Sequence, residues 1–263
     1  DLEQHGFDSS LTDRVRRLAP NISMLRQEWP LAESQWNSLL ADAVAVQDAD
    51  GVLAARFGLS EVAFFSEDYE SAWNQLNEIL EDLDPADTNP ATRRMSAKVI
   101  IRLMKIKMTE EDPPWDEIGQ WVTKAKETAP SFGMIYEADW ILGESLNKRK
   151  RYAEAEAAFE AVLRNPRAIN SKTAAESRYG IALSRFDRDL YVSAAQAFID
   201  TYGEQGAPSD LKANSLLGAA FCYEKTQQLD EAISLYERVA AEFPRTNHEQ
   251  NARSKLAELN AQN

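Results

Sequence analysis

The sequence predicts an all-α fold, an α-solenoid in which helix pairs follow one another along the chain. Three observations support this prediction. One pattern recurs, in which an aromatic residue or Leu is followed by Ala three positions later and by a large apolar residue four positions further on. A second stretch with helical periodicity precedes each copy of the pattern. Gly and Pro number only 10 each among 263 residues, which is unlike the composition of a turn-rich all-β protein.

Four segments carry the repeated pattern in full, and a fifth carries a weaker form. The spacing i, i+3, i+7 places the three residues on one face of a helix, and the small middle residue lets a second helix approach closely. The full copies are Tyr69-Ala72-Leu76, Tyr152-Ala155-Phe159, Tyr191-Ala194-Phe198 and Leu229-Ala232-Tyr236, and the weaker copy is Trp115-Ile118-Val122. Successive middle positions are separated by 46, 37, 39 and 38 residues, a period typical of an α-solenoid.

Each repeated segment is expected to be the second helix of a pair. Pro residues that stop a helix follow several of these segments, at Pro85, Pro130, Pro166 and Pro244. The predicted helix pairs span residues 53–83, 94–129, 134–165, 172–203 and 211–243. We expect Ala72, Ala155, Ala194 and Ala232 to be buried where two helices cross, because only a small side chain permits that approach.

The chain is divided into three parts around this array. Residues 1–50 are expected to form an N-terminal arm and a leading helix, residues 51–246 the array of about five helix pairs, and residues 247–263 a C-terminal capping helix. Within the first part, a short helix near 11–18 is expected to end at Pro20. A Gly turn at Asp48–Gly51 is expected to separate helices at 32–47 and 51–65.

These residues together resemble the tetratricopeptide repeat (TPR) family. The copy at 213–246 matches best, with Leu216, Ala220, Tyr223, Ala232, Tyr236 and Pro244 in register, whereas the segment at 99–132 departs most. The resemblance extends over roughly residues 50–246 and implies a right-handed superhelix of TPR helix pairs. The motif at 229–246 is also similar to the repeats of bacterial envelope proteins of the BamD type and of Tol–Pal coordinators.

Composition excludes several classes of function. The chain has 29 Lys and Arg against 43 Asp and Glu, a net charge of −14, so its surface disfavours nucleic acid. The longest apolar run, at 216–223, is too short for a transmembrane segment. The only histidines, His5 and His248, lack the spacing of a metal site. We therefore expect no catalytic residue, no metal and no cofactor, and we expect the single Cys222 to be buried and inert.

Charge is distributed unevenly along the first half of the chain. Residues 57–92 contain nine acidic residues and no Lys or Arg. In the next predicted helix Arg94, Lys98, Arg102 and Lys105 form one basic stripe. We expect this stripe to face carboxylates of the helix at 67–84 or of the loop after it. The alternative is a binding surface for an acidic peptide or a lipid headgroup.

The concave groove of a TPR protein is lined by the first helix of each repeat, as the resemblance implies. Chaperone adaptors of the family place Lys and Asn at these positions to clamp a C-terminal carboxylate. This chain has largely apolar and aromatic residues there, namely Trp140, Glu144, Tyr179, Leu183, Leu217 and Phe221. Two interpretations remain open. Neighbouring helices or the N-terminal arm cover these side chains, or the groove binds an apolar helix or an extended peptide of a partner protein.

The function predicted on this basis is that of a non-catalytic protein–protein interaction scaffold, with bacterial cell-envelope assembly as its narrower form. The alternatives are a TPR module that targets a larger enzyme, and a TPR domain that binds a small ligand or lipid in its groove. A periplasmic or otherwise extracytoplasmic location is favoured over the cytoplasm. The oligomeric state and the identity of the partner are left open by the sequence.

Overall fold

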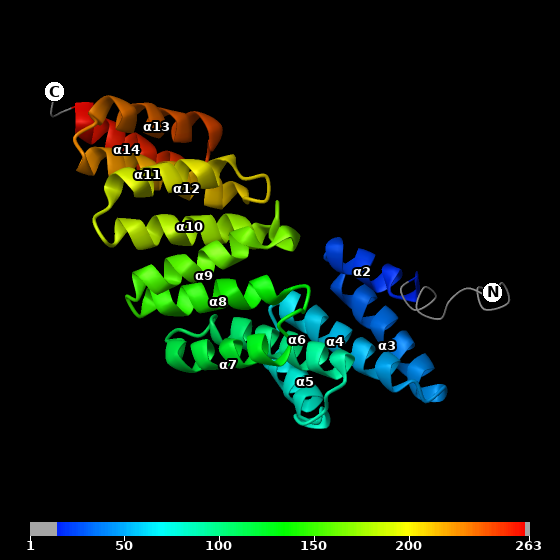
Figure 1. Ribbon diagram of the computed structural model, residues 1–263. Coiled ribbons are helices and arrows are strands. Elements are labelled where there is room, and N and C mark those ends of the chain that lie inside the picture. Colours follow the sequence, from blue (N-terminus) through cyan, green and yellow to red (C-terminus); the bar gives the residue numbers. More distant parts are fainter. Residues whose placement is uncertain (1–14, 261–263) are drawn as a thin grey trace. The chain divides into compact units, whose positions relative to one another are not determined.

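The computed structural model describes residues 15–260, which form helices joined by short turns (Figure 1). This part of the chain contains thirteen α-helices, one 3-10 turn and no strand, which confirms the predicted all-α fold. None of the described helices combines the length and the apolar character needed to cross a membrane.

The chain divides into two compact units, the first ending at Pro113 and the second beginning at Pro114. The helices of the first unit are α2 (Leu18–Leu25), α3 (Trp29–Ala45), α4 (Ala49–Phe65), α5 (Tyr69–Asp82) and α6 (Pro90–Lys107). Those of the second unit are α7 (Trp115–Thr128), α8 (Ile135–Lys148), α9 (Tyr152–Arg164), η2 (Pro166–Ala168), α10 (Lys172–Phe186), α11 (Tyr191–Gly203), α12 (Ser209–Lys225), α13 (Leu229–Glu242) and α14 (Asn247–Asn260).

Helices that are consecutive in the chain pack against each other within each unit. In the second unit, alternate helices also touch, because α10 contacts both α8 and α12, and α12 contacts α14. The helices α8, α10, α12 and α14 therefore share one layer, and Figure 1 shows the second unit rising in chain order from green to red. This arrangement of stacked helix pairs is the predicted α-solenoid.

The predicted pair at 94–129 is divided between the two units. Helix α6 packs against α5 in the first unit, and α7 packs against α8 in the second. The linking segment contains Pro113 and Pro114, and a residue before Pro is driven out of the helical region, so the pair is interrupted at this point. The proposed limits of the array, at residues 51 and 246, stay a prediction.

The four small residues of the repeated pattern occupy helix crossings. Ala72, Ala155, Ala194 and Ala232 each have no exposed surface, which confirms the expected burial. Ile118, at the weaker copy, is equally buried, so this position accepts a larger side chain where the neighbouring helix leaves room.

Glycines in the first helices allow an equally close approach to an aromatic ring. A Cβ atom added at Gly143 of α8 would lie 2.5 Å from the ring of Phe159, and one added at Gly180 of α10 would lie at the same distance from that ring. Phe159 of α9 is therefore held between the backbones of the first helices of two successive repeats. In the same way, a Cβ atom added at Gly218 of α12 would lie 2.9 Å from the ring of Phe198 of α11.

Left-handed residues close several turns between consecutive helices. Gln47, Lys150, Asp189 and Gln227 have φ values of 56–60°, and none of them is Gly. At the last of these turns, the N–H of Gln228 donates to the carbonyl of Tyr223 at 2.9 Å, as in a Schellman closure. The expected Gly turn at Asp48–Gly51 is thus wrong. Gly51 lies inside α4, where its N–H donates to the capping carboxylate of Asp48 at 3.0 Å.

Replacing Gln227 by Gly is expected to raise the free energy of unfolding by about 0.5–1 kcal/mol, because Gly adopts the left-handed region without the steric cost that a Cβ atom imposes. Urea unfolding followed by circular dichroism measures this change. Gln227→Ala is the matched control and should leave stability nearly unchanged. Equal effects of the two substitutions would show that side-chain contacts, not backbone conformation, matter at this turn.

The N-terminal part differs from its prediction. Helix α2 begins at Leu18 and continues past Pro20 to Leu25, instead of ending at Pro20. Pro is compatible with the first turn of a helix, where its missing N–H costs no hydrogen bond. Residues 1–14, with His5 and most of the predicted short helix, lie outside the described residues.

Candidate partner-binding groove

The six predicted groove residues lie on three helices of one layer in the second unit. Trp140 and Glu144 are on α8, Tyr179 and Leu183 on α10, and Leu217 and Phe221 on α12. All six side chains are partly exposed, so none of them belongs to the fully buried core.

The aromatic side chains of this layer are anchored by other rings. Tyr179 packs edge-on against Phe198 of α11, with ring centroids 5.4 Å apart. The ring of Phe221 packs against that of Phe186 of α10, with ring centroids 5.7 Å apart. The ring of Phe221 also has the ammonium groups of Lys225 and Lys255 at 5.0 and 6.0 Å from its centroid. Rings that are fixed on one side and accessible on the other are the kind of side chain that dominates binding at protein interfaces.

Glu144 is the acidic member of this set. The pKa of its carboxyl group is raised from 4.5 to about 7, chiefly by burial; Lys148, one turn along α8, opposes the shift, and the charge of Glu176 on α10 adds to it. The charge of Glu144, together with burial, in turn raises the pKa of the Tyr179 hydroxyl. Glu144 lies on α8 and both Glu176 and Tyr179 lie on α10, two helices that contact each other.

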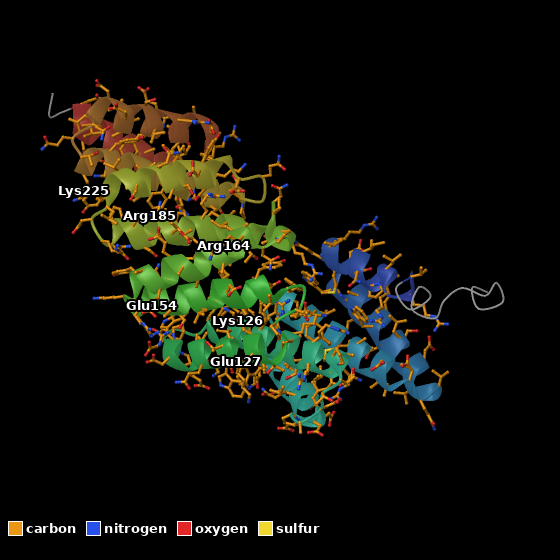
Figure 2. All side chains as sticks on the ribbon, viewed as in Figure 1. Lys126, Glu127, Glu154, Arg164, Arg185 and Lys225 are labelled. Atoms are coloured by element: carbon orange, nitrogen blue, oxygen red, sulfur yellow. The ribbon has the colours of Figure 1, made fainter. Side chains whose placement is uncertain are left out.

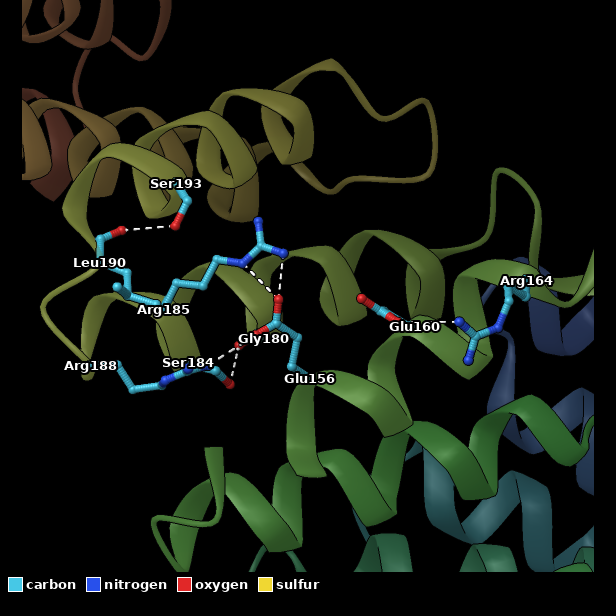
Figure 3. A network of polar contacts seen from close by, with 9 residues as sticks. All are labelled: Glu156, Glu160, Arg164, Gly180, Ser184, Arg185, Arg188, Leu190 and Ser193. Carbon is cyan, nitrogen blue, oxygen red and sulfur yellow. Dashed lines mark hydrogen bonds and ion pairs between the residues drawn. The ribbon is translucent and has the colours of Figure 1, made fainter. Parts of the chain in front are cut away.

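Several enclosed carboxylates of the second unit are paired with a cation. Glu156 of α9 accepts hydrogen bonds from the guanidinium of Arg185 of α10, one of them 2.7 Å from Nε (Figure 3). Asp139 of α8 pairs with Lys126 of α7, which Figure 2 labels. Glu204 accepts from Arg178 at 2.7 Å. These pairs connect neighbouring helices and neutralise the buried charge.

Sequence reasoning singled out Glu144 but missed Glu176 and Phe186. Both lie on α10, the first at i−3 from Tyr179 and the second at i+3 from Leu183. That spacing places each of them on the same helix face as its neighbour, and it was the signal that would have found them.

Two residues of the basic stripe of α6, Arg102 and Lys98, contact α4 and not the helix that was predicted. Arg102 pairs with Glu61 of α4, Nε to Oε1 at 2.5 Å and Nη2 to Oε2 at 2.7 Å. Its guanidinium also lies over the ring of Phe64, 4.3 Å from the centroid. The carboxylate of Asp82 on α5 pairs instead with Arg56 of α4.

Helix α4 thus supplies both partners, a carboxylate toward α6 and a guanidinium toward α5. Arg102 is buried, so it is not accessible to an acidic ligand, and its pairing with Glu61 serves packing within the first unit. Lys98 contacts the ring of Phe57 in the same unit, 3.9 Å from its centroid.

Cys222 is fully buried on α12. Burial raises the pKa of its thiol to about 11, so little thiolate forms near neutral pH. The expected burial of Cys222 is confirmed, and its inertness stays a prediction.

Stacked helix pairs with small residues at their crossings are typical of TPR solenoids, and the second unit has this architecture. The family model described as "Tetratricopeptide repeat" matches residues 214–246, which is the segment that carries the best copy of the repeat. No curated protein matches the sequence significantly.

Solved structures share this architecture. PilF of Pseudomonas aeruginosa superposes with a TM-score of 0.66 at 17% identity, over 94% of this chain and 98% of that one. PilW, a widely conserved type IV pilus biogenesis factor, superposes with a TM-score of 0.69 at 15% identity, over 91% of this chain and 97% of PilW. NprR in complex with its cognate peptide NprX superposes with a TM-score of 0.55 at 13% identity, over 99% of this chain and 74% of NprR. These likenesses show the fold and confirm the resemblance to TPR proteins.

Proposed function

We propose that this chain is a non-catalytic protein-interaction scaffold that binds a segment of a partner protein along α8, α10 and α12. The observation that carries the proposal is the set of half-buried aromatic and apolar side chains in one helix layer. An apolar surface of this kind favours aggregation unless a partner covers it. The peptide complex of NprR, which has a similar fold, supports an extended or helical segment as the occupant.

The narrower form of this proposal is a role in bacterial cell-envelope assembly. Its support is the likeness to PilW, described as a pilus biogenesis factor, and to PilF. Fractionation of the producing cells tests it, because an envelope scaffold should become sensitive to added protease once the outer membrane is permeabilised. Recovery only in the fraction that stays protected would contradict the envelope role and leave the scaffold role standing.

Replacing Tyr179 by Ala is expected to weaken partner capture by about tenfold or more without unfolding the chain, because truncating an aromatic anchor typically costs a complex 2 kcal/mol or more. Crosslinking in cell extracts measures the effect, with a photoreactive amino acid at position 183 of α10. The same amino acid at position 192, which is exposed on α11, shows the background.

Tyr202→Ala is the matched control, because Tyr202 is an aromatic residue of α11 whose hydroxyl donates to Glu242 outside the proposed groove. Crosslinked partners should persist with this variant. If Tyr179→Ala yields the same crosslinked partners in the same amounts as the unsubstituted chain, the groove assignment is wrong.

A further inference from the structure

Helix α2 carries an apolar stripe on its exposed side. The stripe consists of Val15, Leu18, Ile22 and Leu25, which follow one another at intervals of three, four and three residues and so lie on one helix face. Their side chains are 42, 54, 46 and 86% exposed. Val15 precedes the first residue of α2, but Arg17 between them has helical backbone angles, so the stripe continues through it.

The opposite face of α2 already holds this helix against α3 (Figure 1). Ser23 is buried, and its hydroxyl donates to the side-chain oxygen of Gln35 on α3 at 2.9 Å. Met24 packs on the apolar cluster that contains Trp36. Turning α2 to bury the stripe would break these contacts, so the stripe stays on the surface of the first unit.

Basic side chains border the α2 stripe. Residues 14–27 contain four Arg and no Asp or Glu, although the whole chain has a net charge of −14. Arg16 and Arg26 are exposed, and Arg17 is half-buried. An apolar helix face with Arg beside it is typical of helices that lie in the headgroup layer of an anionic membrane.

The end of α3 adds apolar surface near the start of the stripe. Arg16 and Arg17 line one cavity together with Val46, whose side chain is also exposed. Asp42 and Asp48 line this cavity as well, so the acid-free border of the stripe is its other end, at Arg26. The negative charge of more distant residues is screened over about 8 Å at physiological salt.

We propose that the α2 stripe docks reversibly on an anionic lipid surface, with its apolar side chains in the headgroup layer and the neighbouring Arg side chains on lipid phosphates. Four partly exposed aliphatic side chains offer less than the area of about 800 Å² that each partner of a stable protein complex buries. A helix at a membrane surface needs only one apolar face and adjacent positive charge. Because α2 is already folded against α3, docking does not have to order the helix.

This surface belongs to the first unit and shares no residue with the proposed groove on α8, α10 and α12. The inference therefore goes beyond the proposed function, and its failure would leave the scaffold role standing.

Flotation of the full chain with lipid vesicles tests the inference. Phosphatidylcholine vesicles with about 30% phosphatidylglycerol should carry the chain at least about tenfold better than pure phosphatidylcholine vesicles, and about 0.5 M salt should release it. Ile22→Gln combined with Leu25→Gln should weaken binding about tenfold or more, because the stripe loses apolar area. Arg26→Gln should weaken binding about fivefold.

Matched controls remove the same groups elsewhere on the surface. Val192→Gln removes an exposed apolar side chain of α11, and Arg164→Gln removes an exposed positive charge of α9. Each control should change vesicle binding less than about twofold. Unchanged circular dichroism spectra and unfolding midpoints confirm that each variant is folded.

A fluorescent probe reports whether the stripe itself enters the lipid. Since Cys222 is buried, an environment-sensitive dye should attach selectively to Leu25→Cys. Its emission should shift to the blue with the anionic vesicles, whereas the same dye on Val192→Cys should not respond.

Three results would overturn the inference. The first is that the chain does not float with anionic vesicles, and the second is that Ile22→Gln with Leu25→Gln leaves flotation unchanged. The third is a concentration-dependent self-association that this double variant abolishes and that anionic vesicles do not displace, which would make a second copy of the chain the occupant of the stripe.

Discussion

Replacing Gly180 by Ala is expected to lower the free energy of unfolding by about 2–3 kcal/mol, although Ala is favoured over Gly in a helix interior by about 1 kcal/mol. The added Cβ atom would lie 2.5 Å from the ring of Phe159. That ring cannot retreat, because the backbone of Gly143 lies equally close on its other side. Overpacking therefore outweighs helix propensity at this position, and urea unfolding measures the result.

Gly203→Ala provides the matched control, because a Cβ atom added at the end of α11 has no heavy atom within 4 Å. This variant should be unchanged, or more stable by up to about 1 kcal/mol. In a Phe159→Leu background the loss caused by Gly180→Ala should shrink, since the shorter side chain leaves room for the methyl group. Similar stability changes at positions 180 and 203 would show that the ring moves aside at little cost.

Replacing Glu144 by Gln is expected to stabilise the free chain by at most about 3 kcal/mol at pH 8, the free energy that corresponds to a displaced pKa of this size. Its carboxyl pKa is raised from the ordinary 4.5 to about 7, chiefly by burial. Between these values the folded state holds a proton that the unfolded state has released. The stability of the unsubstituted chain therefore falls as the pH rises through this window.

Glutamine is neutral at every pH, so the difference between Glu144→Gln and the unsubstituted chain should be near zero below about pH 4.5, grow up to about pH 7 and then stay constant. Urea unfolding at a series of pH values measures this curve. Glu160→Gln, at an exposed residue paired with Arg164, should change stability by no more than about 1 kcal/mol. A difference that does not vary with pH would show that Glu144 titrates normally.

Much of the second unit could be predicted from the sequence because its repeat is a local pattern. Ala155, Ala194 and Ala232 recur at helical spacing with large apolar residues beside them, and all three are fully buried. The division at Pro113 and Pro114 could not be predicted in the same way. A weak copy of the repeat followed the Pro pair, and periodicity alone does not reveal which neighbour a helix packs against.

The candidate groove was predictable only in part. The residue types of Trp140, Tyr179 and Phe221 and their helical phase were available from the sequence. The partial exposure of Tyr179 and Phe221 depends on how far Phe198 of α11 and Phe186 of α10 cover them, and each of these covering residues lies on a neighbouring helix. The unpaired state of Glu144 depends on where each nearby Lys and Arg points after folding.

The all-α solenoid, the helix pairs of the second unit and the small residues at their crossings could all be predicted from local pattern in the chain. Helical periodicity and side-chain size act between residues that are close in the chain, so they can be read without the fold. The pairing of Arg102 with Glu61 of α4, and not with a carboxylate of α5, became visible only in the folded chain. The partial burial of Glu144 could not be predicted either, because burial and ion pairing depend on side chains that come together only when separate helices pack.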